Sequence, residues 1–352
     1  DLHNLSQKYS DSRRTTIAPE AREDFTEADL VADEDVLISF TQRGYIKRVG
    51  LNAYRTTARG RRGVMGQTVR EEDEVLMLVH ARTLDTVLFF SDRGKVYSEK
   101  VYQIPDANRA DRGIPITNLL SLDQGERITA SVVVPNFEAA SYCTMATVNG
   151  RVKRVALAEF TNVRSAGLIA ITLEEGDELG WVRLTTGKDE IILVTAMGQA
   201  LRISEDEVRP MGRQAAGVTG IRLAKGDRVA AMEVVEPEGY LLVVTSRGFA
   251  KRTALREYTT KGRATGGVAT IDQKNLSKIG EIAVARVVQE EDEITVISAN
   301  GMVLRQKVKT ISPTGRTTRG IHFMELAKGD SVASLARISA VDQQESGKNA
   351  GR

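Results

Sequence analysis

Six stretches of the chain share one pattern of hydrophobic and polar positions. Each has an apolar, β-branched run, a short polar linker that ends in glycine, and a second run, as in DVLISFTQRGYIKRV at residues 35–49. The glycines recur at intervals of 48 to 56 residues, at Gly44, Gly94, Gly150, Gly198, Gly248 and Gly301. Glycine reaches a positive φ without steric cost, which tight hairpin turns need. The pattern therefore predicts six β-hairpins.

Two further segments follow each hairpin. The first has the pattern Arg-x-x-x-Gly followed by Val, Ile or Leu; its arginines are Arg59, Arg109, Arg213, Arg263 and Arg316, and the third repeat has Arg164 one position later. The second is an acidic turn before another apolar run, as in EEDEVLMLV. Each unit thus holds about four short strands, typical of a propeller blade.

The repeats predict an all-β fold, a six-bladed β-propeller of about four strands per blade. One such sheet cannot bury both of its faces, so the units must stack on one another. A β-solenoid is the alternative, but its repeats are shorter. The repeats occupy residues 33–338. The polar residues 1–32 are expected to be a linker from a preceding domain, partly helical, and residues 339–352 a disordered tail.

Charge is distributed unevenly along the chain. The net charge is +2, but residues 1–35 carry four basic and ten acidic residues, so the remainder carries +8. The single cysteine, Cys143, excludes a disulfide within the chain and a multi-cysteine zinc site. No apolar run approaches the roughly 18 residues of a membrane span, and no signal peptide opens the chain. A cytoplasmic location without membrane contact is therefore expected.

Basic residues recur at a fixed position after the hairpin glycine. The fourth residue after it is Ser98 in one repeat and arginine in the others: Arg48, Arg154, Arg202, Arg252 and Arg305. Lys47, Lys153 and Lys251 precede three of these arginines. With the Arg-x-x-x-Gly segments and the adjacent Arg112 and Arg319, almost every blade presents two basic positions.

Equivalent positions of a propeller fall on equivalent spots around a ring, so this register predicts a basic belt. Such a belt would bind DNA phosphates without reading sequence and would bend the duplex. A single strand-end arginine can instead be solvated or paired with a nearby carboxylate.

Residues 57–67, TARGRRGVMGQ, are the most basic of these segments. Arg59, Arg61 and Arg62 supply positive charge. Gly60, Gly63 and Gly66 lack side chains that would keep the main chain from a phosphate, and they free N–H groups for anion contact. We expect a phosphate-binding loop here; a flexible glycine turn is the alternative.

Together these segments resemble the family of C-terminal DNA-wrapping domains of DNA gyrase A. GYIKR, SDRGKVYSEKVYQIP, NGRVKRV and MGRQAAGVTGIRLAKGD are similar to that family's repeats. The resemblance implies a β-pinwheel, a propeller whose blades exchange strands. The family's first-blade box, Gln-[Arg/Lys]-Arg-Gly-Gly-[Arg/Lys]-Gly, is degenerate here. In residues 57–63 only Arg59, Gly60, Arg62 and Gly63 match it, while Arg61 restores the lost charge one step away.

The resemblance implies a non-catalytic role in an ATP-dependent type II DNA topoisomerase. The domain would wrap double-stranded DNA and present a segment for strand passage in negative supercoiling. Implied partners are the N-terminal domain of gyrase A and the whole of gyrase B, in an A2B2 assembly. The holoenzyme would use ATP and Mg; no cofactor, metal or catalytic residue is assigned to this domain, because the family's catalytic tyrosine lies upstream. The alternatives are the equivalent C-terminal domain of topoisomerase IV and a propeller that binds proteins.

Overall fold

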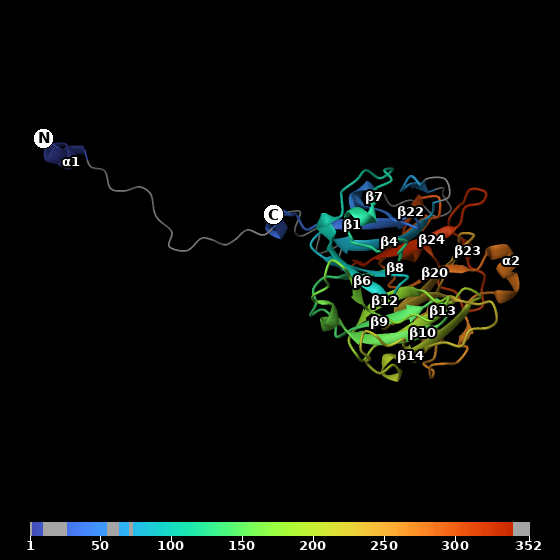
Figure 1. The fold of residues 1–352 in the computed structure, drawn as a ribbon. Helices are drawn as coiled ribbons and strands as arrows, with labels where there is room; N and C mark the ends of the chain where they lie inside the picture. The colour runs from blue at the N-terminus through green and yellow to red at the C-terminus, as the bar shows by residue number, and fades with distance from the viewer. Residues whose placement is uncertain (1, 10–26, 55–62, 70–72, 341–352) are drawn as a thin grey trace. The chain divides into compact units, whose positions relative to one another are not determined.

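The computed structural model describes residues 2–9, 27–54, 63–69 and 73–340. Contacts within the chain define two units, Asp1–Ala32 and Asp33–Arg352. The first contains helix α1 (Leu2–Tyr9) and the 3-10 helix η1 (Glu27–Leu30), and the second contains every strand of the described residues (Figure 1). No helix in these described ranges is long and apolar enough to cross a membrane.

The strands of the second unit form six antiparallel sheets of four strands, the blades. From inner to outer strand, blade 1 contains β4 (Val75–Arg82), β1 (Asp35–Thr41), β2 (Tyr45–Gly50) and β7 (Ile114–Pro115); blade 2 contains β8 (Ile128–Val134), β5 (Thr86–Ser91), β6 (Lys95–Lys100) and β11 (Leu168–Ile169); and blade 3 contains β12 (Leu179–Thr185), β9 (Tyr142–Thr147), β10 (Arg151–Ala156) and β15 (Val218–Thr219).

The other three blades repeat this order. Blade 4 contains β16 (Val229–Val234), β13 (Glu190–Thr195), β14 (Gln199–Ser204) and β19 (Val268–Ala269); blade 5 contains β20 (Ile282–Val288), β17 (Tyr240–Thr245), β18 (Phe249–Ala254) and β23 (Ile321–His322); and blade 6 contains β24 (Val332–Ile338), β21 (Glu293–Ser298), β22 (Met302–Lys307) and β3 (Val64–Met65). The predicted all-β six-bladed propeller is confirmed.

Each blade takes its outer strand from another repeat. In blade 1, β4, β1 and β2 come from the first repeat, whereas β7 comes from the second. Blade 6 is completed by β3 of the first repeat, with Met65 opposite Met302 and Val64 opposite Val303. Strand exchange therefore closes the ring, in agreement with the pinwheel that the resemblance implied.

Hydrophobic clusters fill the space between neighbouring blades. Both faces of the first hairpin strands are buried, because alternate residues point to opposite neighbours. Leu37 belongs to the cluster between blades 6 and 1, whereas Ile38 belongs to the cluster between blades 1 and 2. Inner strands of successive blades contact one another around a central cavity of about 730 Å³ (Figure 1).

The hairpin turns have the backbone conformation that the sequence predicts. All six hairpin glycines have φ between +71° and +90°. A hydroxyl three residues before the glycine accepts a hydrogen bond from the N–H one residue after it. The six hydroxyls belong to Thr41, Ser91, Thr147, Thr195, Thr245 and Ser298. Each turn is therefore fixed by its own side chain.

Short helical turns connect the strands. A 3-10 helix follows each hairpin: η2 (Leu51–Ala53), η3 (Val101–Gln103), η5 (Leu157–Phe160), η6 (Glu205–Glu207), η7 (Leu255–Glu257) and η9 (Val308–Thr310). The others among the described residues are η4 (Ile116–Asn118), η8 (Gln273–Asn275) and α2 (Leu276–Ile279).

Candidate nucleic-acid interface

The three lysines of the predicted belt lie in the interior. Lys47, Lys153 and Lys251 are at most 1% exposed, and each ammonium group donates hydrogen bonds to main-chain carbonyls. The Nζ atom of Lys47 lies 2.9 Å from the carbonyl oxygen of Gly66 and 2.6 Å from that of Arg109. Burial lowers the pKa of each lysine to about 8. These ammonium groups bind the protein's own backbone.

Two of the arginines at the next position join neighbouring blades. The guanidinium of Arg305 on β22 lies 2.6 Å from a carboxylate oxygen of Glu293 and donates to the carbonyls of Leu51 and Tyr54, at 3.1 and 2.9 Å. Arg202 makes the equivalent contacts in blade 4, with Glu190 and with the carbonyls at the η7 turn. Since Leu51 belongs to the first repeat, Arg305 supports the seam where the ring closes.

Arg154 and Arg252 are buried on tyrosines. Their guanidinium carbons lie 4.7 and 4.5 Å from the ring centroids of Tyr142 and Tyr240, and the two side chains are 6% and 2% exposed. Both also pair with a carboxylate, at 3.3 and 2.9 Å. In blade 1, Nε and Nη1 of Arg48 are buried and have no hydrogen-bond partner within the described residues.

This geometry corrects the expected surface belt at one set of positions. The second hairpin strand is covered on both faces by neighbouring blades, so a basic residue there is drawn into contacts between repeats. The residues concerned are Lys47, Arg48, Lys153, Arg154, Arg202, Lys251, Arg252 and Arg305. They are left out of the DNA-binding proposal below.

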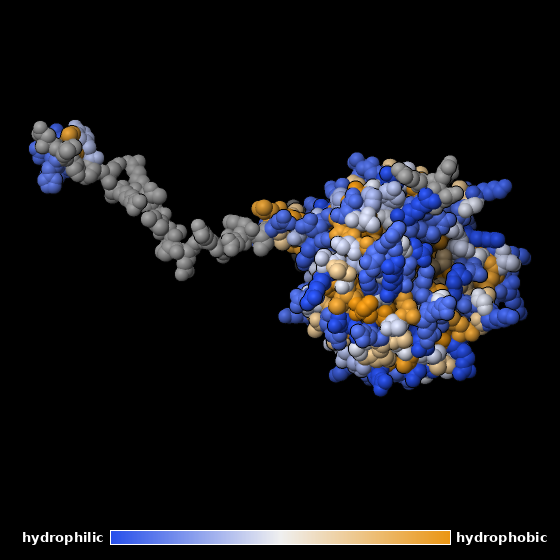
Figure 2. All heavy atoms as spheres, in the orientation of Figure 1, coloured by the Kyte–Doolittle hydropathy of each residue, from blue (hydrophilic) through white to orange (hydrophobic). Residues whose placement is uncertain are grey.

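The arginines of the Arg-x-x-x-Gly segments lie in different surroundings. Each described loop leads into a two-residue outer strand, on the side of the blade away from the central cavity. Arg164 and Arg319 are exposed, and five others are partly exposed: Arg109, Arg112, Arg213, Arg263 and Arg316. Figure 2 shows hydrophilic residues predominating toward the edge of the ring. We call these loops the rim loops.

Some rim-loop arginines have local partners. Nε of Arg213 lies 2.9 Å from a carboxylate oxygen of Glu159, and both side chains are at least 35% exposed. Arg263 donates to the carbonyls of Glu207 and Thr219, each at 3.2 Å, and the guanidinium of Arg112 lies 4.5 Å from the ring centroid of Tyr45. An exposed ion pair contributes at most about 1 kcal/mol, so Arg213 can exchange Glu159 for a phosphate.

The glycines of the rim loops allow close approach to the preceding blade. A Cβ atom on Gly63 would lie 2.6 Å from the carbonyl oxygen of Val303, and one on Gly113 would lie 2.3 Å from that of Ile46. The structure thus gives Gly63 a packing role in place of the phosphate access expected from the sequence. Arg59, Gly60, Arg61 and Arg62 lie outside the described residues, and DNA contact there stays a prediction.

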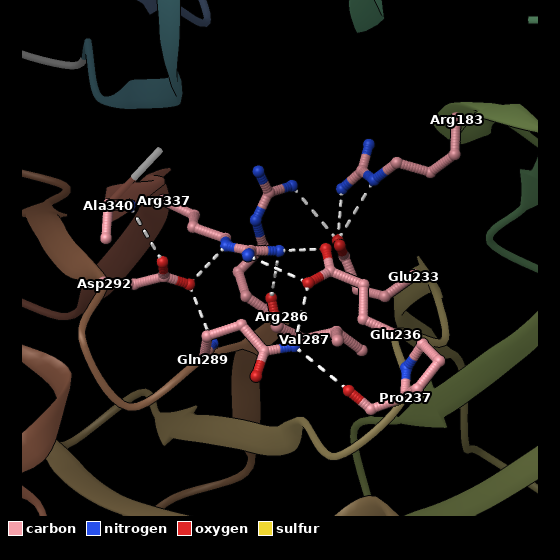
Figure 3. Close-up of polar contacts among 10 residues, drawn as sticks. All are labelled: Arg183, Glu233, Glu236, Pro237, Arg286, Val287, Gln289, Asp292, Arg337 and Ala340. Carbon is pink, nitrogen blue, oxygen red and sulfur yellow. Dashed lines mark hydrogen bonds and ion pairs between the residues drawn. The ribbon is translucent and has the colours of Figure 1, made fainter. Parts of the chain in front are cut away.

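Three further arginines lie at the central cavity, but carboxylates balance their charge. Figure 3 shows Arg183 and Arg286 converging on Glu233, and Arg337 between Glu236 and Asp292. Three positive and three negative groups give no net charge that would draw DNA into the cavity. No group of three or more His, Cys, Asp or Glu that could hold a metal occurs in the described part of the chain.

The repeats of the chain match one known protein family. The family described as DNA gyrase C-terminal domain, beta-propeller, matches six segments, at residues 35–79, 85–135, 141–185, 189–236, 239–289 and 292–339. These segments correspond to the six blades and make up most of the chain. The chain belongs to the DNA gyrase C-terminal domain family.

Curated relatives agree with this family of gyrase domains. The chain is 48% identical to the DNA gyrase A protein of Halalkalibacterium halodurans over 347 residues, which is 98% of this chain and 41% of that protein. It is 42% identical to the DNA gyrase A protein of Escherichia coli K12 over 339 residues, 96% of this chain and 38% of that protein. The chain therefore spans about two fifths of the length of these relatives.

Solved structures of gyrase and topoisomerase IV domains share the fold. A DNA gyrase A C-terminal domain matches with a TM-score of 0.80 and 26% identity, covering 87% of this chain and all of that one. The C-terminal domain of a DNA topoisomerase IV matches with a TM-score of 0.65 and 29% identity, covering 90% of this chain and 96% of that one. The resemblance inferred from the repeats is thus confirmed.

Proposed function

We propose that this gyrase C-terminal domain binds duplex DNA along its rim and wraps it without reading sequence. The observation that carries the proposal is the recurrence of partly or fully exposed arginines in successive rim loops. Phosphates lie every ~1.7 Å along the duplex axis, so arginines spaced around a ring can follow a curved backbone. Contacts of this kind position DNA and carry no sequence information.

Within a longer protein, the wrapped segment would be presented for strand passage in ATP-dependent negative supercoiling. The partners in this proposal are the N-terminal domain of gyrase A and the whole of gyrase B, in an A2B2 assembly in the cytoplasm. The curated relatives are DNA gyrase A proteins, which favours gyrase over the equivalent domain of topoisomerase IV. The similarity to the topoisomerase IV domain keeps that enzyme as the second candidate.

A salt titration tests the rim as a phosphate-binding surface. Each phosphate contact contributes about 0.9 to the negative slope of log affinity against log salt concentration. We expect a steep slope for this chain with a 40-bp duplex, and a slope smaller by about 2 when Arg164 and Arg319, both exposed in rim loops, are replaced by alanine.

The matched control is Lys188→Ala, which removes an exposed positive charge between β12 and β13, outside the rim loops. This variant should keep the unmodified chain's slope. A flat titration of the unmodified chain would remove the proposal. Equal losses for control and rim variants would show that the DNA follows another surface.

A further inference from the structure

Buried lysines hold the backbone of rim loops. Lys153 lies on β10, and its Nζ atom donates to the carbonyl of Arg213 and, at 2.7 Å, to that of Ala170. Lys251 on β18 donates to the carbonyl of Gly315 at 2.7 Å and to that of Arg316. Lys47 on β2 donates to the carbonyls of Asn108 and Arg109, at 3.1 and 2.6 Å. In all three cases the carbonyl of a rim-loop arginine accepts a hydrogen bond from a lysine of the preceding repeat.

Two of these lysines also connect successive segments of the rim. Lys47 binds the carbonyl of Gly66, which follows outer strand β3, and that of Arg109, which precedes outer strand β7. Lys153 binds the carbonyl of Ala170, which follows β11, and that of Arg213, which precedes β15. One ammonium group thus fixes the spacing between two neighbouring points on the ring's edge.

The lysines occur in every second repeat. They lie three residues after the hairpin glycines of the first, third and fifth repeats. The same position holds Tyr97, Leu201 and Leu304 in the second, fourth and sixth repeats. All six side chains are buried, so the site in the fold is the same and only the group that fills it differs.

Packing alone gives no reason for an ammonium group at this site. Leucine fills the equivalent space in blades 4 and 6, and a buried charge is costly unless hydrogen bonds compensate it. The compensation comes from the loop carbonyls together with acidic side chains nearby, Asp111, Glu159 and Glu257. The ammonium group therefore exchanges core packing for control of the loop.

We infer that Lys47, Lys153 and Lys251 are positioning residues for DNA wrapping, and that they pre-form the rim loops of Arg109, Arg213 and Arg316. The inference rests on the proposed function. Because these loops are ordered before DNA arrives, their arginines bind phosphate with a smaller loss of conformational entropy. The rim then alternates between loops fixed by a lysine and loops without one. A wrapped duplex would meet a rigid contact at every second blade.

The variant Lys153→Met tests this inference, with Leu201→Met as the matched control at the same position of the next repeat. Methionine keeps the aliphatic stem of lysine and removes the ammonium group. Hydrogen exchange of the amides of residues 212–217 should accelerate in Lys153→Met, and affinity for a 40-bp duplex should fall roughly eightfold at 0.1 M salt, the value of one phosphate contact. Leu201→Met should change neither measurement.

A double-mutant cycle separates positioning from a general loss of stability. If Lys153 acts through its loop, Arg213→Ala should weaken binding by the same factor, and the variant with both substitutions should bind no worse than either one. Combining Lys153→Met with Arg164→Ala, in a rim loop without a lysine, should instead multiply the two effects. Should Lys153→Met fail to fold, Lys251→Met with Arg316→Ala supplies the same cycle.

Two outcomes are distinguishable. Unchanged exchange in residues 212–217 together with multiplied effects of Lys153→Met and Arg213→Ala would overturn the positioning role while leaving DNA binding intact. An unmodified chain without salt-dependent binding would overturn the proposed function, and the exchange measurement would still report whether the lysine orders its loop.

Discussion

At the scale of single residues, the position of an arginine within its repeat decides its role. Arg202 and Arg305 follow the hairpin turn by four residues and are held by Glu190 and Glu293 on the adjoining strand and by carbonyls of the next repeat. Arg164 and Arg319 precede an outer strand and are exposed. The first pair stabilises contacts between blades, and the second pair is available to a ligand.

The buried lysines make stability depend on pH. The pKa of Lys251 is lowered from 10.5 to about 8 in the folded state, mainly by burial. Between pH 8 and 10.5 the unfolded chain binds more protons, so the free energy of unfolding contributed by this group rises with pH. From pH 7.5 to 9.5 the unmodified chain should gain up to about 2 kcal/mol relative to Lys251→Met.

Urea unfolding at the two pH values measures this difference. Lys188→Met, which replaces an exposed lysine, should show no relative change. Parallel pH profiles for the unmodified chain and Lys251→Met would show that the ammonium group titrates as it does in water.

At the scale of strands and turns, the sequence predicts the hairpins better than the outer strands. The hairpin glycines mark turns that are confirmed in all six repeats. The outer strands are two residues long, too short for alternation to be visible, and their partners lie in another repeat. The interior position of Lys47 was also hidden, because both faces of β2 are covered and charge alone suggests a surface.

The rim-loop glycines set how closely an outer strand can approach. Gly320 has φ +78°, and a Cβ atom there would lie 2.4 Å from the carbonyl oxygen of Ala250. Gly320→Ala should therefore lower the free energy of unfolding by at least about 1–3 kcal/mol, because the backbone conformation is strained for alanine and the outer strand is pushed away. Chemical denaturation measures the loss.

Gly315→Ala in the same rim loop is the control, since a Cβ atom there meets nothing within 4 Å. It should leave stability within about 0.5 kcal/mol of the unmodified chain. Similar losses for both variants would mean that loop entropy, and not the close approach at Gly320, accounts for the effect.

At the scale of the whole domain, a closed ring with arginines on its edge can be followed only by a bent duplex. Smooth bending of 20–30 bp by 40–90° costs about 1–6 kcal/mol, so contacts from several blades must contribute. Energy transfer between dyes at the two ends of a 40-bp duplex should increase when the chain binds. Replacing Arg164 and Arg319 together should reduce that increase. Binding without any change in transfer would indicate a straight contact with one side of the ring.

Strand exchange also ties folding to the order of protein synthesis. A ribosome releases β3 long before its partner strand β22, because Met65 and Met302 are about 240 residues apart, or roughly 12–50 s of elongation at 5–20 residues per second. Blades 1 to 5 can each be completed once the following repeat emerges, whereas blade 6 must capture a segment made at the start. The newborn domain therefore passes through an open arc whose two ends both lack a partner, and only the last repeat converts it into a ring.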